Sequence, residues 1–256
     1  MSAPRRRLRS SLARSDRDRI VVRGHDLAAE LIGKVSLGDM AFLELKGRLP
    51  TAEESTVFNA IAITLVEHGM TPSAIAARLT YLGAPEALQG AVAAGILGMG
   101  DRFGGPVDAA ARMLQEALAG EPPEADLAAV AARVVAGLRE ARRLIPGLGH
   151  PVHTAGDPRV PALFGVAAEN GFEGRYVQLM KLVGAEAKRA SGKDLPINAT
   201  GAIGAIASEL EIPWQVCRGL SVMARAIGLV AHLQEELSDP MAAEIWTRVE
   251  EESGRD

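Results

Sequence analysis

The chain has 256 residues, of which 48% are hydrophobic, 23% are charged and only 4% are aromatic. This composition is typical of a globular protein and excludes a disordered chain, and the length fits one domain or two lobes that share a core. A formal charge of -4 provides no global positive field for nucleic acid, and no apolar run reaches the length of a membrane span. The single cysteine, Cys217, excludes a disulfide framework and a cysteine-based metal site and favours a cytoplasmic location.

The N-terminal segment is the strongly basic part of the sequence, with seven arginines in residues 5–19. Asp16 and Asp18 argue against a mitochondrial transit peptide, and the segment lacks the apolar stretch of a secretory signal. We therefore expect residues 1–19 to form a flexible, solvated arm. A targeting signal or a local contact with an anion or a partner are the alternatives.

Helical signals recur along the rest of the chain. Thr51 and Glu54 form a capping box before an apolar run that ends at Val66. Thr71 and Pro72 are typical of the cap and first residue of the next helix. Further helices are predicted over residues 107–118, 126–144, 160–169, 175–190, 201–210 and 213–237. Because no good alternating strand segment is found, the sequence predicts an all-α protein.

The last long predicted helix carries both an apolar stripe and an isolated charge. The stripe advances by steps of four and three residues and consists of Val216, Leu220, Met223, Ile227 and Val230. Arg225 has almost no polar neighbours in the sequence, and a buried guanidinium group needs an anionic partner. That partner is either an internal carboxylate or the carboxylate of a ligand, since the bidentate fork of arginine suits both.

Residues 145–159, IPGLGHPVHTAGDPR, form a loop rich in glycine, proline and histidine. Gly147 and Gly149 allow the backbone to approach a ligand closely. His150 and His153 alone would indicate a metal, but no third ligand follows at a recognisable spacing and the sequence has no H-E-x-x-H motif, so no metal is expected. We favour a neutral histidine that donates a hydrogen bond to an acyl oxygen.

A second glycine-rich segment, GILGMGDRFGG at residues 95–105, lacks the Gly-Lys-Ser/Thr ending of a P-loop. Close packing of helices through small residues is its ordinary explanation, although Asp101 and Arg102 leave room for a site. His68 and His232 are more typical of structural histidines than of catalysts.

Six segments, in order along the chain, read KVSLGDMAFLELKGRLPTAEE, EHGMTPSAIAARL, GDRFGGPVDAAARML, IPGLGHPVHTAGDPR, NATGAIGAI and MARAIGLVAHLQEE. Together they resemble the citrate synthase superfamily, and the similarity is closest to short citryl-CoA lyase-like members and to the citrate-synthase-like module of ATP-citrate lyase. The resemblance implies an all-α fold with a small helical domain, residues 105–212, inserted into a large one, residues 20–104 and 213–256. It also implies coenzyme A as acyl carrier, a di- or tricarboxylate substrate, and a homodimer or higher homo-oligomer.

The resemblance assigns roles to individual residues. His150 is expected to hold the oxo or hydroxyl oxygen of a four-carbon acid, and Arg159 and Arg225 are expected to bind substrate carboxylates. His153 and Phe103 are expected beside the substrate. The stretch expected to wrap the CoA adenine through its backbone consists of Ile145, Pro146, Gly147, Leu148 and Gly149.

The sequence departs from the family pattern at several positions. Phe103 stands where citrate synthases have a histidine before Gly-Gly, as it does in the ATP-citrate lyase module. Thr200 replaces the aspartate that exchanges the α-proton, and a threonine hydroxyl is not a general base near neutral pH without activation. Pro151 and Thr154 stand where basic residues often bind the CoA phosphates.

We therefore expect a CoA-dependent carbon–carbon lyase of the citryl-CoA lyase type, which cleaves a hydroxyacyl-CoA such as citryl-CoA to acetyl-CoA and an oxo acid, or catalyses the reverse condensation. His150 or His153 is the candidate base, Asp101 the candidate acid, and Asn198 and Thr200 the candidate donors to a carbonyl. The alternatives are an aldol-type lyase or synthase for a different acyl-CoA, and a non-catalytic paralogue that binds CoA or a carboxylate.

Overall fold

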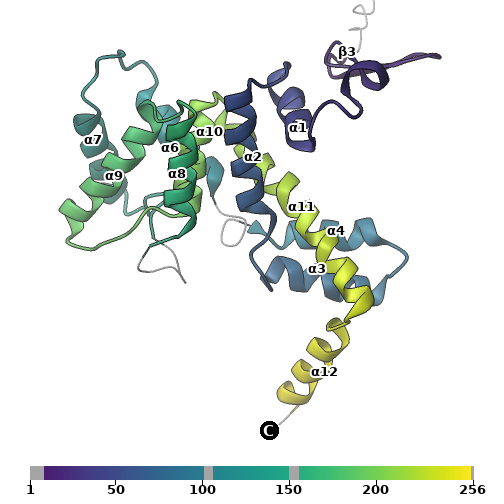
Figure 1. The fold of residues 1–256 in the computed structure, drawn as a ribbon. Coiled ribbons are helices and arrows are strands. Elements are labelled where there is room, and N and C mark those ends of the chain that lie inside the picture. Colours follow the sequence, from purple (N-terminus) through teal and green to yellow (C-terminus); the bar gives the residue numbers. More distant parts are fainter. Residues whose placement is uncertain (1–8, 101–105, 150–155, 255–256) are drawn as a thin grey trace, which may run out of the picture. The chain divides into compact units, whose positions relative to one another are not determined.

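The computed structural model describes residues 9–100, 106–149 and 156–254. It is mainly helical, as predicted, and the chain divides into two compact units, Met1–Asn59 and Ala60–Asp256 (Figure 1). The division into an inserted small domain and a surrounding large domain stays a prediction.

The first unit contains a small antiparallel sheet that the sequence analysis missed. Its strands lie in the order β1 (Ala13–Ser15), β2 (Ile20–Val22) and β3 (His25–Asp26). Strands of two or three residues contain too few alternations to be recognised from a sequence, and β1 lies in the segment assigned to a flexible arm. The π-helix η1 (Leu27–Leu31), α1 (Leu37–Lys46) and the start of α2 (Ala52–Val66) complete the unit.

Helix α2 begins as the capping signal in the sequence predicts, whereas Thr71 before the next helix makes no side-chain capping bond. Glu54 N–H donates to the Thr51 hydroxyl at 3.2 Å, and the Glu54 carboxylate accepts from Thr51 N–H at 2.9 Å, which confirms the capping box. The helices of the second unit are α3 (Pro72–Gly83), α4 (Leu88–Leu97), α6 (Val107–Leu118), α7 (Leu127–Glu140), α8 (Arg159–Glu169), α9 (Arg175–Ser191), α10 (Ala199–Glu209), α11 (Trp214–Ser238) and α12 (Ala242–Ser253). The helix predicted over residues 107–118 has these bounds in the structure.

Helix α10 is the most deeply buried element of the second unit. It packs against α6, α8 and α9, and its sequence, ATGAIGAIASE, has no charge before its last residue. A helix that is apolar or small on every side is suited to such a central position. The small residues also bring neighbouring backbones close, since a Cβ atom at Gly204 would lie 2.8 Å from Ala111 N.

Helix α11 packs against α3, α4 and α6, but its core-facing side is not the predicted stripe. Leu220 is buried, whereas Val216, Met223, Ile227 and Val230 are each 39–49% exposed. The side chains turned inward include leucines, Leu229 and Leu233, as well as small and polar residues such as Ala224 and Arg225. Both faces of the helix are apolar, so periodicity alone does not identify the one that faces the core.

Among the described residues, α11 is the one helix long and apolar enough to cross a membrane by length and composition. Half of its most apolar window is buried inside the protein, and a core helix meets the same criterion.

The close approach at Gly204 predicts that an alanine is tolerated less well there than at a glycine with open space around it. Gly204→Ala should lower the melting temperature, because overpacking against α6 costs about 1–3 kcal/mol, roughly 2–4 °C per kcal/mol. Gly137→Ala in α7 is the matched control, since nothing lies within 4 Å of a Cβ there, and it should leave the melting temperature unchanged or raise it slightly. Equal melting temperatures for the two variants in calorimetry would contradict the packing around α10.

Candidate active site

The glycine-rich stretch 145–149 is fixed against the segment that leads into α10. Leu148 forms an isolated antiparallel bridge with Ile197. Gly149 N–H donates to the Pro196 carbonyl at 2.8 Å, and Asn198 N–H donates to the Gly147 carbonyl at 2.9 Å. These bonds make the stretch a preformed backbone surface.

Gly147 is required by the protein itself. Its φ is +88°, and a Cβ atom there would lie 2.5 Å from Gly201 Cα. The sequence analysis explains this glycine by close approach to a ligand. The structure shows close approach to the first turn of α10, which only a pair of glycines permits.

Asn198 joins the loop to α10. Its side-chain oxygen accepts from Gly201 N–H at 3.1 Å as the N-cap of the helix, and its amide nitrogen donates to the Gly149 carbonyl at 2.6 Å. Asn198 is a predicted donor to a substrate carbonyl, but both its side-chain oxygen and its amide nitrogen already bond to the backbone of the protein. Thr200, half-buried in the first turn of α10, lies two residues further on.

Asp157 connects the first residue of α10 with the first residue of α8. Its buried carboxylate accepts from Ala199 N–H at 2.9 Å and forms a bidentate pair with Arg159, at 2.9 Å from Nε and 2.8 Å from Nη2. Burial alone would raise the pKa of this carboxyl, but the bonds from Arg159 and Ala199 outweigh burial and hold the pKa of Asp157 well below its usual range. The pair leaves Nη1 as the remaining donor nitrogen of Arg159.

Arg225, from the middle of α11, has an internal carboxylate nearby but no hydrogen bond to it. Its side chain is 8% exposed, and Nη1 lies 3.8 Å from Oε1 of Glu67. Nη1 is buried without a hydrogen-bond partner among the described residues. The sequence analysis leaves an internal carboxylate and a ligand carboxylate open as partners; the internal one is present, and a donor is still unsatisfied.

Arg159 and Arg225 act on each other electrostatically. Burial lowers the pKa of Arg225, the negative charge of Glu67 opposes this effect, and the positive charge of Arg159 adds to it. The two predicted arginines, one at the start of α8 and one in the middle of α11, are therefore close enough for the charge of Arg159 to affect the pKa of Arg225. Guanidinium groups that still have N–H donors, such as Nη1 of Arg225, suit a ligand that carries carboxylates.

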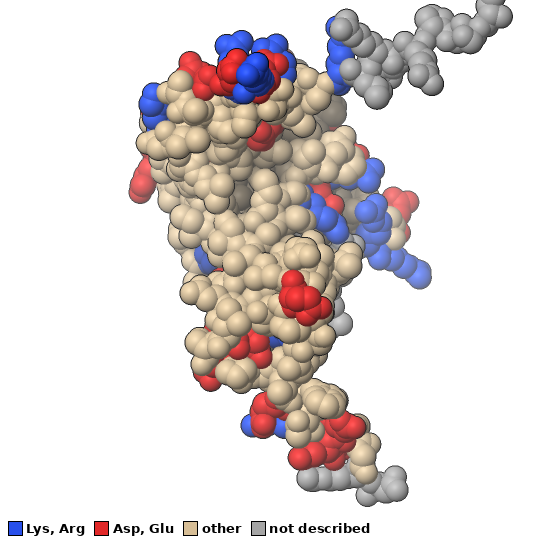
Figure 2. All heavy atoms as spheres, turned by 90° about the vertical axis from the view of Figure 1, so that its right-hand side faces the viewer, with Lys and Arg blue, Asp and Glu red and all other residues tan. Residues whose placement is uncertain are grey.

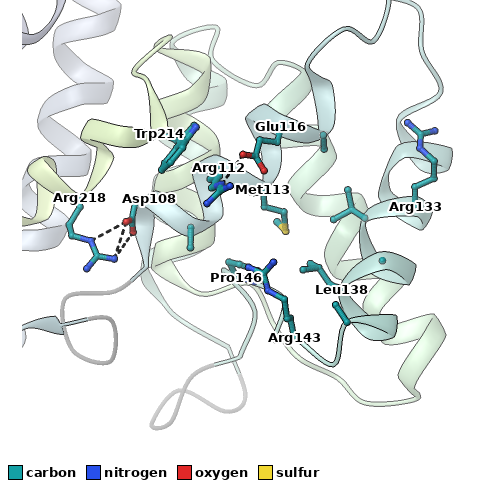
Figure 3. Close-up of a pocket in the computed structure, with 15 residues that line it drawn as sticks. Asp108, Arg112, Met113, Glu116, Arg133, Leu138, Arg143, Pro146, Trp214 and Arg218 are labelled. Carbon is teal, nitrogen blue, oxygen red and sulfur yellow. Dashed lines mark hydrogen bonds and ion pairs between the residues drawn. The ribbon is translucent and has the colours of Figure 1, made fainter.

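A cavity of about 630 Å³ lies elsewhere in the second unit, between α6, α7 and the start of α11 (Figure 3). Arg112 stacks over the ring of Trp214 at 4.8 Å, and Arg218 pairs with Asp108 at 2.9 Å. Of the predicted site residues, Pro146 lines this cavity, whereas Arg159 and Arg225 do not. The cavity is therefore distinct from the arginine pair.

Four predicted site residues, Asp101, Phe103, His150 and His153, lie outside the described residues. Within the described ranges, no group of three histidine, cysteine, aspartate or glutamate side chains is arranged to hold a metal ion. Cys217 is no nucleophile, because burial, with a smaller effect of Asp108, raises the pKa of its thiol to about 12.

The sequence analysis missed two residues of the site, Asp157 and Glu67. Both lie inside segments quoted for the family resemblance, Asp157 two residues before Arg159 and Glu67 directly before His68. The partner of Glu67, His232, lies on a helix far away in the sequence, whereas Asp157 pairs with the nearby Arg159 as well as with Ala199 at the start of α10.

The chain is similar to several known proteins. Citryl-CoA lyase from Hydrogenobacter thermophilus is 34% identical, with 91% of this chain and 88% of that chain aligned and a TM-score of 0.82. The ATP citrate lyase from Methanothrix soehngenii, solved in complex with citrate and coenzyme A, shares the fold at 22% identity and a TM-score of 0.73; 93% of this chain and 40% of that chain are aligned.

Curated relatives are longer proteins. The probable ATP-citrate synthase subunit 1 of Schizosaccharomyces pombe is 28% identical over 229 residues, which are 82% of this chain and 35% of that protein. The ATP-citrate synthase beta chain protein 2 of Arabidopsis thaliana is 29% identical over 233 residues, 83% of this chain and 37% of that protein. The chain thus spans little more than a third of the length of these relatives.

The family model for the C-terminal domain of citrate synthase matches residues 40–246, a range that contains the glycine-rich loop, Asp157 and both arginines. This chain therefore belongs to the citrate synthase family.

Proposed function

We propose that the chain is a CoA-dependent carbon–carbon lyase of the citryl-CoA lyase type, which cleaves citryl-CoA or a related hydroxyacyl-CoA to acetyl-CoA and an oxo acid, or catalyses the reverse condensation. The observation that carries this proposal is the buried Nη1 of Arg225, which has no hydrogen-bond partner among the described residues, together with Arg159, whose positive charge acts on Arg225. The 34% identity to a citryl-CoA lyase over nearly the full length of both chains supports it.

In this proposal the arginines hold the oxo-acid part of the substrate. Arg225 presents Nη1, and Arg159 presents the edge that Asp157 leaves free. Because Asp157 fixes Nε and Nη2 of Arg159, the guanidinium plane is oriented before substrate arrives, which lowers the entropic cost of binding.

The cleavage is a retro-aldol step. A base removes the proton from the tertiary hydroxyl, and the carbonyl of the oxo acid forms as the carbon–carbon bond breaks. The electron pair of the broken bond passes into the thioester enolate. Protonation of the enolate carbon then gives the acetyl thioester. We assign the hydroxyl oxygen to His150, with His153 as the alternative base and Asp101 as the acid.

Thr200 stands where the family has the aspartate that exchanges the α-proton, and Asp157 does not take over that role. Its carboxylate already accepts hydrogen bonds from Arg159 and Ala199, and its lowered pKa disfavours proton uptake. Thr200 is therefore left to donate a hydrogen bond to a developing oxyanion, together with the remaining amide hydrogen of Asn198.

Coenzyme A needs cations for its phosphates, and the loop offers none at Pro151 and Thr154. Basic side chains lie instead at the end of α9, just before the segment that pairs with residues 147–149, and they are Lys188, Arg189 and Lys193. Arg139 reaches the same end of α9 and donates to the Ala190 carbonyl at 2.6 Å. We assign the phosphates of CoA to this basic end of α9.

We also propose that a second copy of the chain covers the exposed stripe of α11. Val216, Met223, Ile227 and Val230 are joined in the same unit by Leu97 of α4, which is 86% exposed. Figure 2 colours the charged side chains, and both signs of charge are present on the face on which it looks. Exposed large apolar side chains that recur along one helix are typical of an interface, and in a two-fold dimer the same patch of both copies meets.

The first prediction concerns catalysis. Citryl-CoA incubated with the protein should yield acetyl-CoA and oxaloacetate, identified by mass spectrometry, and His150→Ala should lower turnover by about 100-fold or more. Turnover that survives within a factor of a few in His150→Ala would remove its assigned role. Stabilisation by CoA or citrate without turnover of any thioester would favour the non-catalytic alternative, and turnover of a different acyl-CoA would favour the other lyase.

The second prediction concerns the arginine pair. Arg225→Gln and Arg159→Gln should each weaken citrate binding in calorimetry by about 10- to 100-fold, because each loses a charge-assisted hydrogen bond worth about 1.5–3 kcal/mol. Arg248→Gln is the matched control, since Arg248 pairs with Glu244 on exposed α12. Citrate affinity equal in all three variants would place the carboxylate site elsewhere.

The third prediction concerns assembly. The wild-type protein should elute as a dimer or higher oligomer in size-exclusion chromatography with light scattering, and Ile227→Asp should shift it towards monomer because a carboxylate is then buried at the interface. Ile32→Asp, a change at an exposed isoleucine of the first unit, serves as control and should leave the mass unchanged. A monomeric wild-type protein at micromolar concentration would contradict the proposal.

A further inference from the structure

Three buried polar residues and one glycine form a row that extends from Arg225 along α11. Arg225, Gly228, His232 and Glu236 recur at steps of three and four residues and therefore lie on one face of the helix. All four are buried. Burying this many polar groups is costly unless each has a partner, so their partners matter.

Glu67, at the end of α2, is the residue that faces Arg225. Its Oε1 accepts from His68 N–H at 2.7 Å and from Gly69 N–H at 2.6 Å, and His232 Nε2 lies 3.2 Å away. Burial alone would raise the pKa of Glu67, but these bonds outweigh burial and lower it, so the group is an anion near neutral pH. The carboxylate is thus held from two sides.

His232 is in turn oriented by Arg78. Nη2 of Arg78 lies 3.1 Å from Nδ1 of His232, and a guanidinium group is only a donor. Nδ1 must therefore accept, which places the proton of the neutral ring on Nε2, where it points at Glu67.

Arg78 is fully buried and anchors the other end of the row. It pairs with Glu236 at 2.6 Å and also with Glu235. The second oxygen of Glu236 accepts from Met241 and Ala242 N–H at 3.0 and 2.8 Å, at the start of α12. The row therefore runs without a break from α12 to the carboxylate that faces Arg225.

Gly228 makes the approach of α2 to α11 possible. A Cβ atom there would lie 2.1 Å from the Val66 carbonyl and 3.0 Å from the Glu67 carboxylate. This geometry holds Glu67 within an ion-pair distance of Arg225 but leaves Nη1 without a hydrogen bond.

We propose that Glu67 is a positioning residue for Arg225: held by His232 and by the backbone of residues 68–69, it aims the Arg225 guanidinium so that Nη1 stays free for a substrate carboxylate. The inference rests on the proposed function, in which Arg225 binds that carboxylate. Glu67 itself touches no substrate in this arrangement, because its oxygens are taken by His68, Gly69 and His232.

Positioning and simple charge have opposite consequences. If Glu67 acted only as a nearby negative charge, its neutralisation would make the site more positive and strengthen the binding of an anion. If it orients Arg225, neutralisation releases the guanidinium and weakens binding. The direction of the change therefore decides between the two.

The test measures citrate binding by calorimetry and the melting temperature in wild-type protein, Glu67→Gln, Glu67→Asp and Glu244→Gln. Glu244 is the matched control, since it also pairs with an arginine, Arg248, on the exposed surface of α12. We expect Glu67→Gln to weaken binding at least five-fold, Glu67→Asp, which keeps the charge, to bind more tightly than Glu67→Gln, and Glu244→Gln to bind as the wild type does. In a turnover assay Glu67→Gln should raise KM more than it lowers kcat.

Two outcomes overturn the inference alone: citrate binding in Glu67→Gln that is unchanged or tighter, while Arg225→Gln still weakens it about ten-fold or more, or a loss in Glu67→Asp as large as in Glu67→Gln. A wild-type protein that binds no citrate, or binds it independently of Arg225, overturns the proposed function and the inference with it. If Glu67→Gln fails to fold, Glu67→Asp against wild type decides, since a citrate affinity weaker by ten-fold or more in that folded variant also contradicts the proposal.

Discussion

The positive charge of Arg159 acts on the buried guanidinium group of Arg225. The structure around both groups depends on how nearby carboxylates compensate their charges. Arg225 lies in the middle of a 25-residue helix, and Arg159 begins another. An unpaired buried charge costs several kcal/mol, so each arginine has a carboxylate of its own, Glu67 or Asp157. The balance is unequal, since Asp157 binds Arg159 bidentately, whereas Glu67 leaves Arg225 with an unsatisfied donor.

The glycine-rich loop and the N-terminus of α10 form the rigid counterpart to this pair. Gly147 packs on Gly201 without room for a side chain on either residue. Asn198 and Asp157 then use both side-chain and backbone bonds to fix the first turn of α10 to the loop and to α8. Residues that resemble ligand-binding positions in sequence therefore also have a structural duty, and a substitution there affects both.

The limits of prediction from sequence follow from the range of the contacts involved. The helix over residues 107–118 was predicted to the residue because its amphipathic pattern and ends are local. The face of α11 that meets the core was not identifiable, since Val216 and Leu220 belong to the same stripe and only one of them is buried. Glu67 was missed because its partner His232 is 165 residues away, and no local pattern reports such a contact.

The double attachment of Asp157 also has a dynamic consequence. Because one carboxylate bonds Ala199 of α10 and Arg159 of α8, the starts of these two helices are connected to each other. Arg225 belongs to a different helix, α11. A small slide of α10 along α11 would thus change the separation of the two guanidinium groups. In the proposed function, the fit of the two arginines to a dicarboxylate would therefore depend on the relative position of α10 and α11.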